Sequence, residues 1–85
     1  MELHYSERFE REYRKLPLSI KKKAERREIL FKKNPFDLRL STHKLHGKLK
    51  DRWSFSIDKR YRILFRFMEK DIVLFIDIGD HRVYQ

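Results

Sequence analysis

The sequence predicts an α+β domain, in which a helical first half is followed by a strand-rich second half. Before residue 35 the apolar residues recur at helical spacing, whereas from Trp53 onward they alternate with polar residues. A length of 85 residues suits one small domain spanning residues 1–85. The composition is 40% hydrophobic and 14% aromatic, which indicates a folded chain rather than a disordered one.

Two helices are expected in the first half, after a short strand at residues 3–5. Ser6 is a suitable N-cap for the first helix, and Pro17 ends it. Ser19 is a suitable N-cap for the second helix. This helix should end at Asn34, because the residue before a proline is driven out of the helical region. The short link between the helices predicts an antiparallel helical hairpin.

The second half predicts three antiparallel strands, preceded by an irregular connection at residues 36–50. The first strand begins at Trp53, and the second covers residues 61–68. The third strand, residues 72–76, is apolar throughout, which suits a central strand covered on both sides. We expect these strands to form a mainly antiparallel twisted sheet with the helical hairpin packed on one face.

The charge of the chain indicates a polyanionic partner. Lys and Arg number 22 against 13 Asp and Glu, giving a formal charge of +9. Such a field attracts RNA, DNA, an acidic protein or an anionic membrane. The apolar run at residues 72–76 is too short to cross a bilayer and residues 1–4 do not begin a secretory signal, so we expect a cytoplasmic protein without a membrane anchor. The absence of cysteine excludes disulfides and thiolate chemistry.

Histidine, arginine and tyrosine side chains near the predicted sheet are suited to phosphodiester chemistry. Cleavage of RNA by its own 2′-OH needs a base, an acid and a cation that stabilises the charge on the phosphate. Histidine, tyrosine and arginine can supply these roles. The candidates are His43, His46, His81, Arg62, Arg66, Arg82 and Tyr84.

Each candidate also has a structural interpretation. His81 could be an exposed residue of a polar tail, and His43 and His46 could be solvent-facing loop residues. Arg62 and Arg66 have the spacing of a solvated strand face. The basic run at residues 21–27 is typical of a solvated helix face, although it could also contact nucleic acid phosphates. Two histidines three residues apart lack further ligands, so neither a metal nor another cofactor is expected.

A series of different short motifs extends along nearly the whole chain. They are Tyr5-Ser6, Phe9, Lys15-Leu16-Pro17, Asn34-Pro35, Lys44 to Leu49, Trp53-Ser54-Phe55, Tyr61 to Phe65 and Ile78 to His81. In this order and spacing they resemble the RelE/ParE superfamily of toxins from type II toxin–antitoxin systems, often called plasmid-stabilisation proteins. Within the superfamily, the chain looks most like the YafQ branch.

The resemblance implies a RelE-like fold, a cognate antitoxin that wraps it, and cleavage of mRNA on the ribosome. By position, His43 and His81 match catalytic histidines of the YafQ branch, and Arg62 matches a catalytic arginine of RelE. Ser54 and Ser56 depart from the pattern, since YafQ has an aspartate and a histidine there and RelE has lysines.

We therefore expect a toxin that is a ribosome-dependent mRNA endoribonuclease and uses metal-independent acid–base catalysis. The alternatives are a ParE-like inhibitor of DNA gyrase and a member that only binds its antitoxin. The expected catalytic residues are His81, His43, Arg62 and Tyr84. The expected contacts to RNA and ribosome are Lys22, Lys23, Arg26, Arg27, His46, Lys48, Lys50, Arg60, Arg66 and Arg82.

Overall fold

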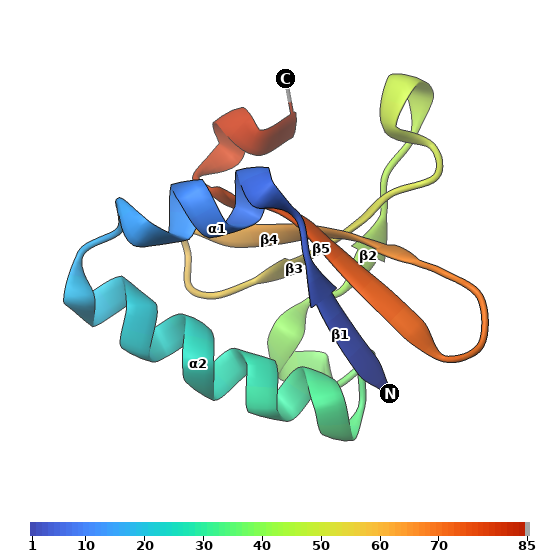
Figure 1. The fold of residues 1–85 in the computed structure, drawn as a ribbon, viewed down its shortest axis with the longest axis horizontal. Coiled ribbons are helices and arrows are strands. Elements are labelled where there is room, and N and C mark those ends of the chain that lie inside the picture. Colours follow the sequence, from blue (N-terminus) through green and yellow to red (C-terminus); the bar gives the residue numbers. More distant parts are fainter. Residues whose placement is uncertain (85) are drawn as a thin grey trace.

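Two helices pack on a five-stranded mixed sheet in the computed structural model, which describes residues 1–84 (Figure 1). The helices are α1 (Glu7–Arg14) and α2 (Leu18–Lys33), and the strands are β1 (Glu2–Tyr5), β2 (His43–Lys44), β3 (Trp53–Ser56), β4 (Arg62–Phe67) and β5 (Ile72–Gly79). Three short 3₁₀ helices are η1 (Leu38–Leu40), η2 (Gly47–Leu49) and η3 (His81–Tyr84). The strand order β1-β5-β4-β3-β2 confirms the predicted α+β class.

The helix boundaries follow their local capping chemistry. Ser6 caps α1 as predicted, because its Oγ accepts a 3.0 Å hydrogen bond from Phe9 N and donates one of 2.7 Å to the Ile76 carbonyl. The predicted Ser19 cap is wrong: α2 begins one residue earlier, and the Pro17 carbonyl accepts hydrogen bonds from the amides of residues 20 and 21. Asn34 is extended and ends α2 as predicted. Among residues 1–84, no helix has the length and apolar character needed to cross a membrane.

The core lies between α2 and one face of the sheet. Phe31 of α2 is fully buried against Phe55, Phe65 and Phe75, one from each of the three central strands. Its ring centroid lies 4.7, 4.9 and 5.5 Å from theirs, the range in which aromatic pairs attract. This cluster fixes which face of the sheet α2 covers.

The sheet combines the expected meander with two features that the sequence did not predict. Strands β3, β4 and β5 are antiparallel neighbours, as predicted, and the expected first strand forms β1. However, β1 runs parallel to β5, because α1 and α2 carry the chain away before it returns. The connection at residues 36–50 also contains β2, which pairs with β3. The two residues of β2 are too few to show a strand periodicity in the sequence.

A β-bulge interrupts the pairing of β4 with β5. Leu64 pairs with Asp77 and Phe65 pairs with Phe75, so Ile76 is an extra residue on β5. Without the bulge, strand alternation would place Asp77 on the same face as Phe75, in the phenylalanine core. The bulge turns the Asp77 carboxylate to the other face of the sheet.

Candidate active site on the open face of the sheet

The face of the sheet turned away from α2, hereafter the open face, carries several of the candidate site residues. Directly paired residues of neighbouring strands point to the same face. One cross-strand row joins His43 to Ser54, Leu64 and Asp77, and the next joins Ser56 to Arg62 and Gly79. The fold therefore brings the predicted His43 and Arg62 to one surface.

The separation of His43 and Arg62 suits a ligand bound between them. They lie two strands and two residues apart, which is about 12 Å between Cα atoms for a strand spacing of about 4.8 Å and a rise of about 3.4 Å per residue. An extended arginine and a histidine together reach across most of that distance. Both side chains can approach one phosphodiester group.

Tyr84 is held above the middle of this face by two hydrogen bonds. Its hydroxyl lies 2.9 Å from Ser54 Oγ and accepts a 3.2 Å hydrogen bond from Arg62 Nη1. The Arg62 guanidinium also lies 5.6 Å from the centre of the Tyr84 ring, in cation–π contact. Ser54 is 1% exposed, and sequence analysis gave it no role in the site. In the sequence Ser54 is only a polar residue of a predicted strand, and the structure shows that Tyr84 covers it.

Gly79 and Val83 place η3, and with it Tyr84, over the sheet. A Cβ on Gly79 would lie 3.1 Å from Val83 Cγ1, closer than ordinary van der Waals contact. Val83 is buried and anchors η3 against the end of β5. The glycine thus permits the close return of the chain that brings Tyr84 back to Arg62.

His43 is exposed, and one of its ring nitrogens is already committed. Nδ1 lies 3.0 Å from the Ser41 carbonyl oxygen, which can only accept, so the neutral ring carries its proton on Nδ1. Ser41 adopts a left-handed conformation, with a φ of 51°, at this point. Nε2 is left as a proton acceptor that faces solvent, which is the form required of a general base.

His81 is exposed at the start of η3. The neighbouring Asp80 carboxylate accepts from Arg82 Nε at 2.9 Å and from Arg82 Nη2 at 3.0 Å. The Arg82 hydrogen bonds lower the pKa of Asp80 from 3.8 to about 2. The Asp80 carboxylate also caps η3, accepting from the Arg82 amide at 3.0 Å, and the nearby His81 further lowers the Asp80 pKa.

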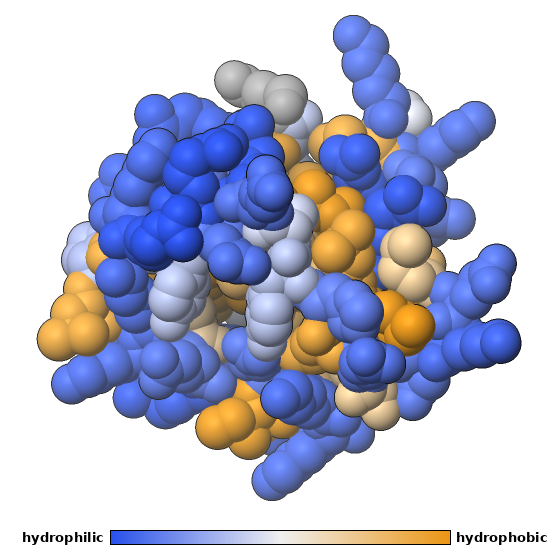
Figure 2. Space-filling view, in the orientation of Figure 1, coloured by the Kyte–Doolittle hydropathy of each residue, from blue (hydrophilic) through white to orange (hydrophobic). Residues whose placement is uncertain are grey.

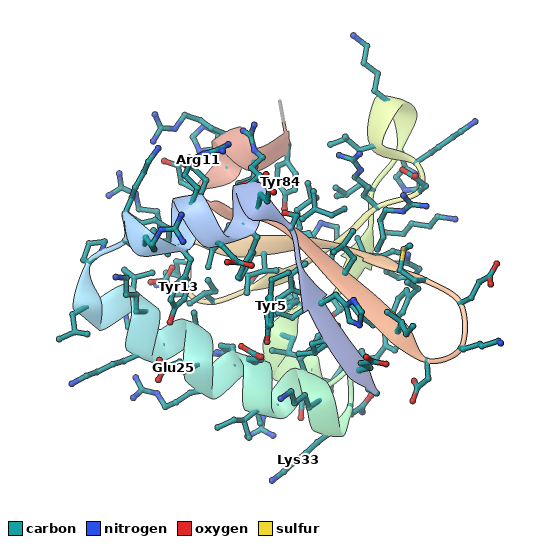
Figure 3. The ribbon with its side chains drawn as sticks, viewed as in Figure 1. Tyr5, Arg11, Tyr13, Glu25, Lys33 and Tyr84 are labelled. Atoms are coloured by element: carbon teal, nitrogen blue, oxygen red, sulfur yellow. The ribbon has the colours of Figure 1, made fainter. Side chains whose placement is uncertain are left out.

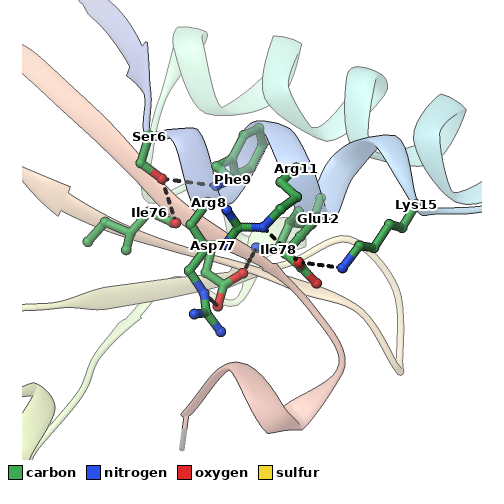
Figure 4. Close-up of polar contacts among 9 residues, drawn as sticks. All are labelled: Ser6, Arg8, Phe9, Arg11, Glu12, Lys15, Ile76, Asp77 and Ile78. Carbon is green, nitrogen blue, oxygen red and sulfur yellow. Dashed lines mark hydrogen bonds and ion pairs between the residues drawn. The ribbon is translucent and has the colours of Figure 1, made fainter.

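An ion pair that sequence analysis missed joins α1 to the bulge (Figure 4). Arg8 Nε donates a 2.9 Å hydrogen bond to Asp77 Oδ2, while Asp77 Oδ1 accepts one of 2.8 Å from the Ile78 amide. The Asp77 side chain is 7% exposed, whereas that of Arg8 is 63% exposed. Asp77 is the single charged residue of β5, and a charge in an apolar strand signals a partner elsewhere in the chain.

Two hollows flank this ion pair and extend the open face toward η2 and η3. One, of about 300 Å³, reaches from Arg8 and Glu12 to Arg82. The other, of about 180 Å³, lies between Arg8, Arg52 and Val83. Several arginines thus border one continuous surface, and Arg8 and Arg52 join those predicted from the sequence.

Two buried guanidinium nitrogens at this surface lack an acceptor. The Nε atoms of Arg52 and Arg62 are buried and have no hydrogen-bond partner among residues 1–84. Arg52 Nε lies 3.8 Å from the nearest Asp51 oxygen, which is too far for a hydrogen bond. Buried donors are nearly always satisfied in proteins, so these two nitrogens are unusual features of this surface.

The remaining candidates divide between the two faces of the molecule. Lys22, Lys23, Arg26 and Arg27 lie on α2 and hence across the sheet from Arg62. Lys23 contacts Asp58 at 3.4 Å, and Arg27 donates to a backbone carbonyl at 2.6 Å. Arg66 lies on β4 on the open face, whereas His46, Lys48, Lys50 and Arg60 lie outside the strands and α2, with Lys48 in η2.

Residues 1–84 contain no cluster of three His, Cys, Asp or Glu side chains that could hold a metal ion. The open face instead combines a proton acceptor on His43, the hydroxyl of Tyr84 and the fixed charge of Arg62. These groups can carry out proton transfer and stabilise a developing oxyanion.

The similarity of this chain to known proteins lies in its structure. No protein-family model matches the chain, and no curated protein matches its sequence. A YoeB/ParE toxin from Agrobacterium tumefaciens superposes with a TM-score of 0.81 at 19% identity, over 95% of this chain and 99% of that one. YafQ from E. coli strain BL21(DE3) superposes with a TM-score of 0.76 at 17% identity, over 98% and 96%.

A third structure contains a bound partner. The E. coli DinJ–YafQ toxin–antitoxin complex superposes with a TM-score of 0.67 at 15% identity, over 96% of this chain and 93% of that one. Identities this low establish the fold alone. The chain therefore has the fold of the YoeB/ParE and YafQ toxins, as its resemblance to the RelE/ParE superfamily predicts.

Proposed function

We propose that the protein is the toxin of a type II toxin–antitoxin system and cleaves mRNA on the ribosome with the residues of its open face. The observation that carries the proposal is the Ser54–Tyr84–Arg62 cluster. The cluster holds the Arg62 guanidinium in place, and the buried Nε of Arg62 has no acceptor among residues 1–84. The neighbouring cross-strand row on the same face includes His43. Hydrogen-bond donors fixed before the substrate arrives are the main source of transition-state stabilisation in such sites.

The proposed reaction is attack of the RNA 2′-oxygen on the adjacent phosphorus. His43 Nε2 takes the 2′-OH proton, and the 5′-oxygen leaves with a proton from His81. The products are a 2′,3′-cyclic phosphate and a 5′-hydroxyl. Arg62 neutralises the charge that develops on the phosphate oxygens, and Tyr84 positions the base or ribose. Neither a metal nor another cofactor is required.

An antitoxin is the proposed protein partner. The chain carries a formal charge of +9, and several of its arginines border the open face. An acidic segment laid over this surface would neutralise the charge and block access to Arg62. Support comes from the DinJ–YafQ toxin–antitoxin complex, which shares the fold.

Primer extension on cellular mRNA after induction of the toxin tests this proposal. Wild-type protein should produce cuts within translated frames, and His81→Ala should reduce them by about 10²- to 10⁴-fold. Lys33→Ala, on α2 and without an assigned role in binding, is the matched control and should leave the cuts unchanged. Growth arrest without any mRNA cleavage would favour the ParE-like gyrase inhibitor, and absence of both would favour a member that only binds its antitoxin.

A further inference from the structure

A cavity between α1 and α2 lies outside the proposed active site. It has a volume of about 270 Å³ and is walled by Tyr5, Phe9 and Tyr13, with Ala24 and Ile63 among its other lining residues. Successive aromatic rings stack along it, with centroid distances of 5.4 Å for Tyr5–Phe9 and 6.0 Å for Phe9–Tyr13. Figure 3 shows Tyr5 and Tyr13 in the space between the two helices.

Carboxylates surround this cavity although the chain as a whole is basic. Glu10 and Glu28 line it, and Glu25 reaches its Tyr13 wall. None of the three forms an ion pair with any of residues 1–84. Most other carboxylates do, as illustrated by the pair of Asp77 with Arg8. The same face of the molecule is otherwise largely hydrophilic (Figure 2).

The tyrosine hydroxyls hold two of these carboxylates in place. Tyr5 donates a hydrogen bond to Glu28 Oε1, and Tyr13 donates one of 3.3 Å to Glu25 Oε1. Burial, followed by the nearby carboxylates, raises the pKa of both phenols above its usual value. The hydroxyls therefore remain protonated hydrogen-bond donors at neutral pH.

Aromatic faces beside fixed carboxylates form a site for a cation. The ring quadrupole attracts positive charge, and the carboxylates add a direct Coulomb term. Lys21 already uses this property, because its Nζ lies 5.7 Å from the centre of the Tyr13 ring. Arg14 also borders the cavity. At physiological ionic strength the remaining positive charge is screened beyond about 8 Å, so the nearby carboxylates dominate the local field.

We propose that the α1–α2 cavity binds an organic cation, namely an aliphatic ammonium or guanidinium group. The apolar floor of Phe9, Ala24 and Ile63 accepts the aliphatic part, while Glu10 and Glu28 face the charge. Either a free polyamine or a lysine or arginine side chain of a bound protein has this chemistry. The site does not depend on RNA cleavage, because it lies on the α2 side of the sheet.

Amide NMR titrations of the isotope-labelled protein at constant ionic strength test the inference. The probes are spermidine for the free amine, and N-acetyl-lysine amide and N-acetyl-arginine amide for the side chains. At least one probe should give saturable shifts centred on Phe9, Tyr13 and Ala24. Saturation by spermidine alone assigns the site to a free polyamine, and saturation by a blocked amino acid assigns it to a protein side chain. Shifts that do not saturate, or that lie elsewhere, overturn the proposal.

A charge-matched pair of variants separates the cavity from general electrostatics. The Glu10 side chain forms no hydrogen bond or ion pair with residues 1–84, so Glu10→Gln should preserve the fold, which the spectrum itself reports. It should weaken probe binding by about two- to fivefold, the usual effect of one partly exposed charge. Glu69→Gln removes an equal charge in the β4–β5 turn and should leave the affinity unchanged. Equal affinities of the two variants would contradict a site in the cavity.

Discussion

Substitution of Tyr84 by phenylalanine removes one oxygen atom from the proposed site and keeps its ring. The Tyr84 hydroxyl is the single hydrogen-bond partner of the Ser54 side chain among residues 1–84, and Ser54 is 1% exposed. Without the tyrosine hydroxyl, the serine is left buried and unsatisfied, which costs about 1–3 kcal/mol. Arg62 Nη1 loses the same partner but retains access to water.

This cost should appear as a lower melting temperature. For a chain of 85 residues, about 1 kcal/mol corresponds to about 5–6 °C, so Tyr84→Phe should melt roughly 5–18 °C below wild type. Circular dichroism during heating and urea titration measures the change. The variant should also cleave mRNA more slowly, because Arg62 is no longer held in place.

A double-mutant cycle with Ser54→Ala decides whether the two hydroxyls act together. Removing both leaves no buried orphan, so Ser54→Ala/Tyr84→Phe should be more stable than the sum of the single effects predicts, by at least about 0.5 kcal/mol. Additive effects within error would refute the inferred hydrogen bond and the positioning of Arg62 that rests on it.

Three further predictions concern the ion pairs and the chemistry. Arg8→Ala leaves Asp77 buried with one hydrogen bond and should lower the free energy of unfolding in urea by about 1–2 kcal/mol. Arg11 is more loosely paired, so Arg11→Ala should lower it by less. Equal losses for the two variants would contradict the Arg8 ion pair. The pKa of Asp80 is depressed from 3.8 to about 2, so its stabilising effect is complete above about pH 4 and is lost as the pH falls toward 2. Asp80→Asn should therefore flatten the acid side of the stability profile, and an unchanged profile would contradict this assignment. Cleavage should survive EDTA under conditions that keep ribosomes intact, and loss of activity would indicate a metal-dependent reaction.

The sequence predicted those features that depend on local chemistry and periodicity. The Ser6 cap, the end of α2 at Asn34 and the β3–β4–β5 meander follow from residues close together in the chain. Strand alternation also placed Arg62 and Arg66 on a common face. Such patterns are visible because neighbouring residues constrain one another directly.

The features that escaped prediction depend on contacts between distant segments. The bulge at Ile76 reverses the side to which Asp77 points, and only the register between β4 and β5 shows it. Strand alternation suggests that Ser54 faces solvent, but Tyr84 of η3 covers it in the structure. The basic residues of α2 are separated from His43 by the sheet, which a charge count along the chain could not show.

The central claim is that the open face cleaves RNA, and single-turnover cleavage of mRNA on purified ribosomes by Arg62→Ala tests it most directly. Lys32→Ala, which removes an equal charge from the other side of the sheet, is the matched control. Removal of one group that stabilises the transition-state charge should slow cleavage by Arg62→Ala about 10²- to 10³-fold, with the Lys32→Ala rate close to wild type. Equal rates for the two variants would contradict the assignment of catalysis to the open face.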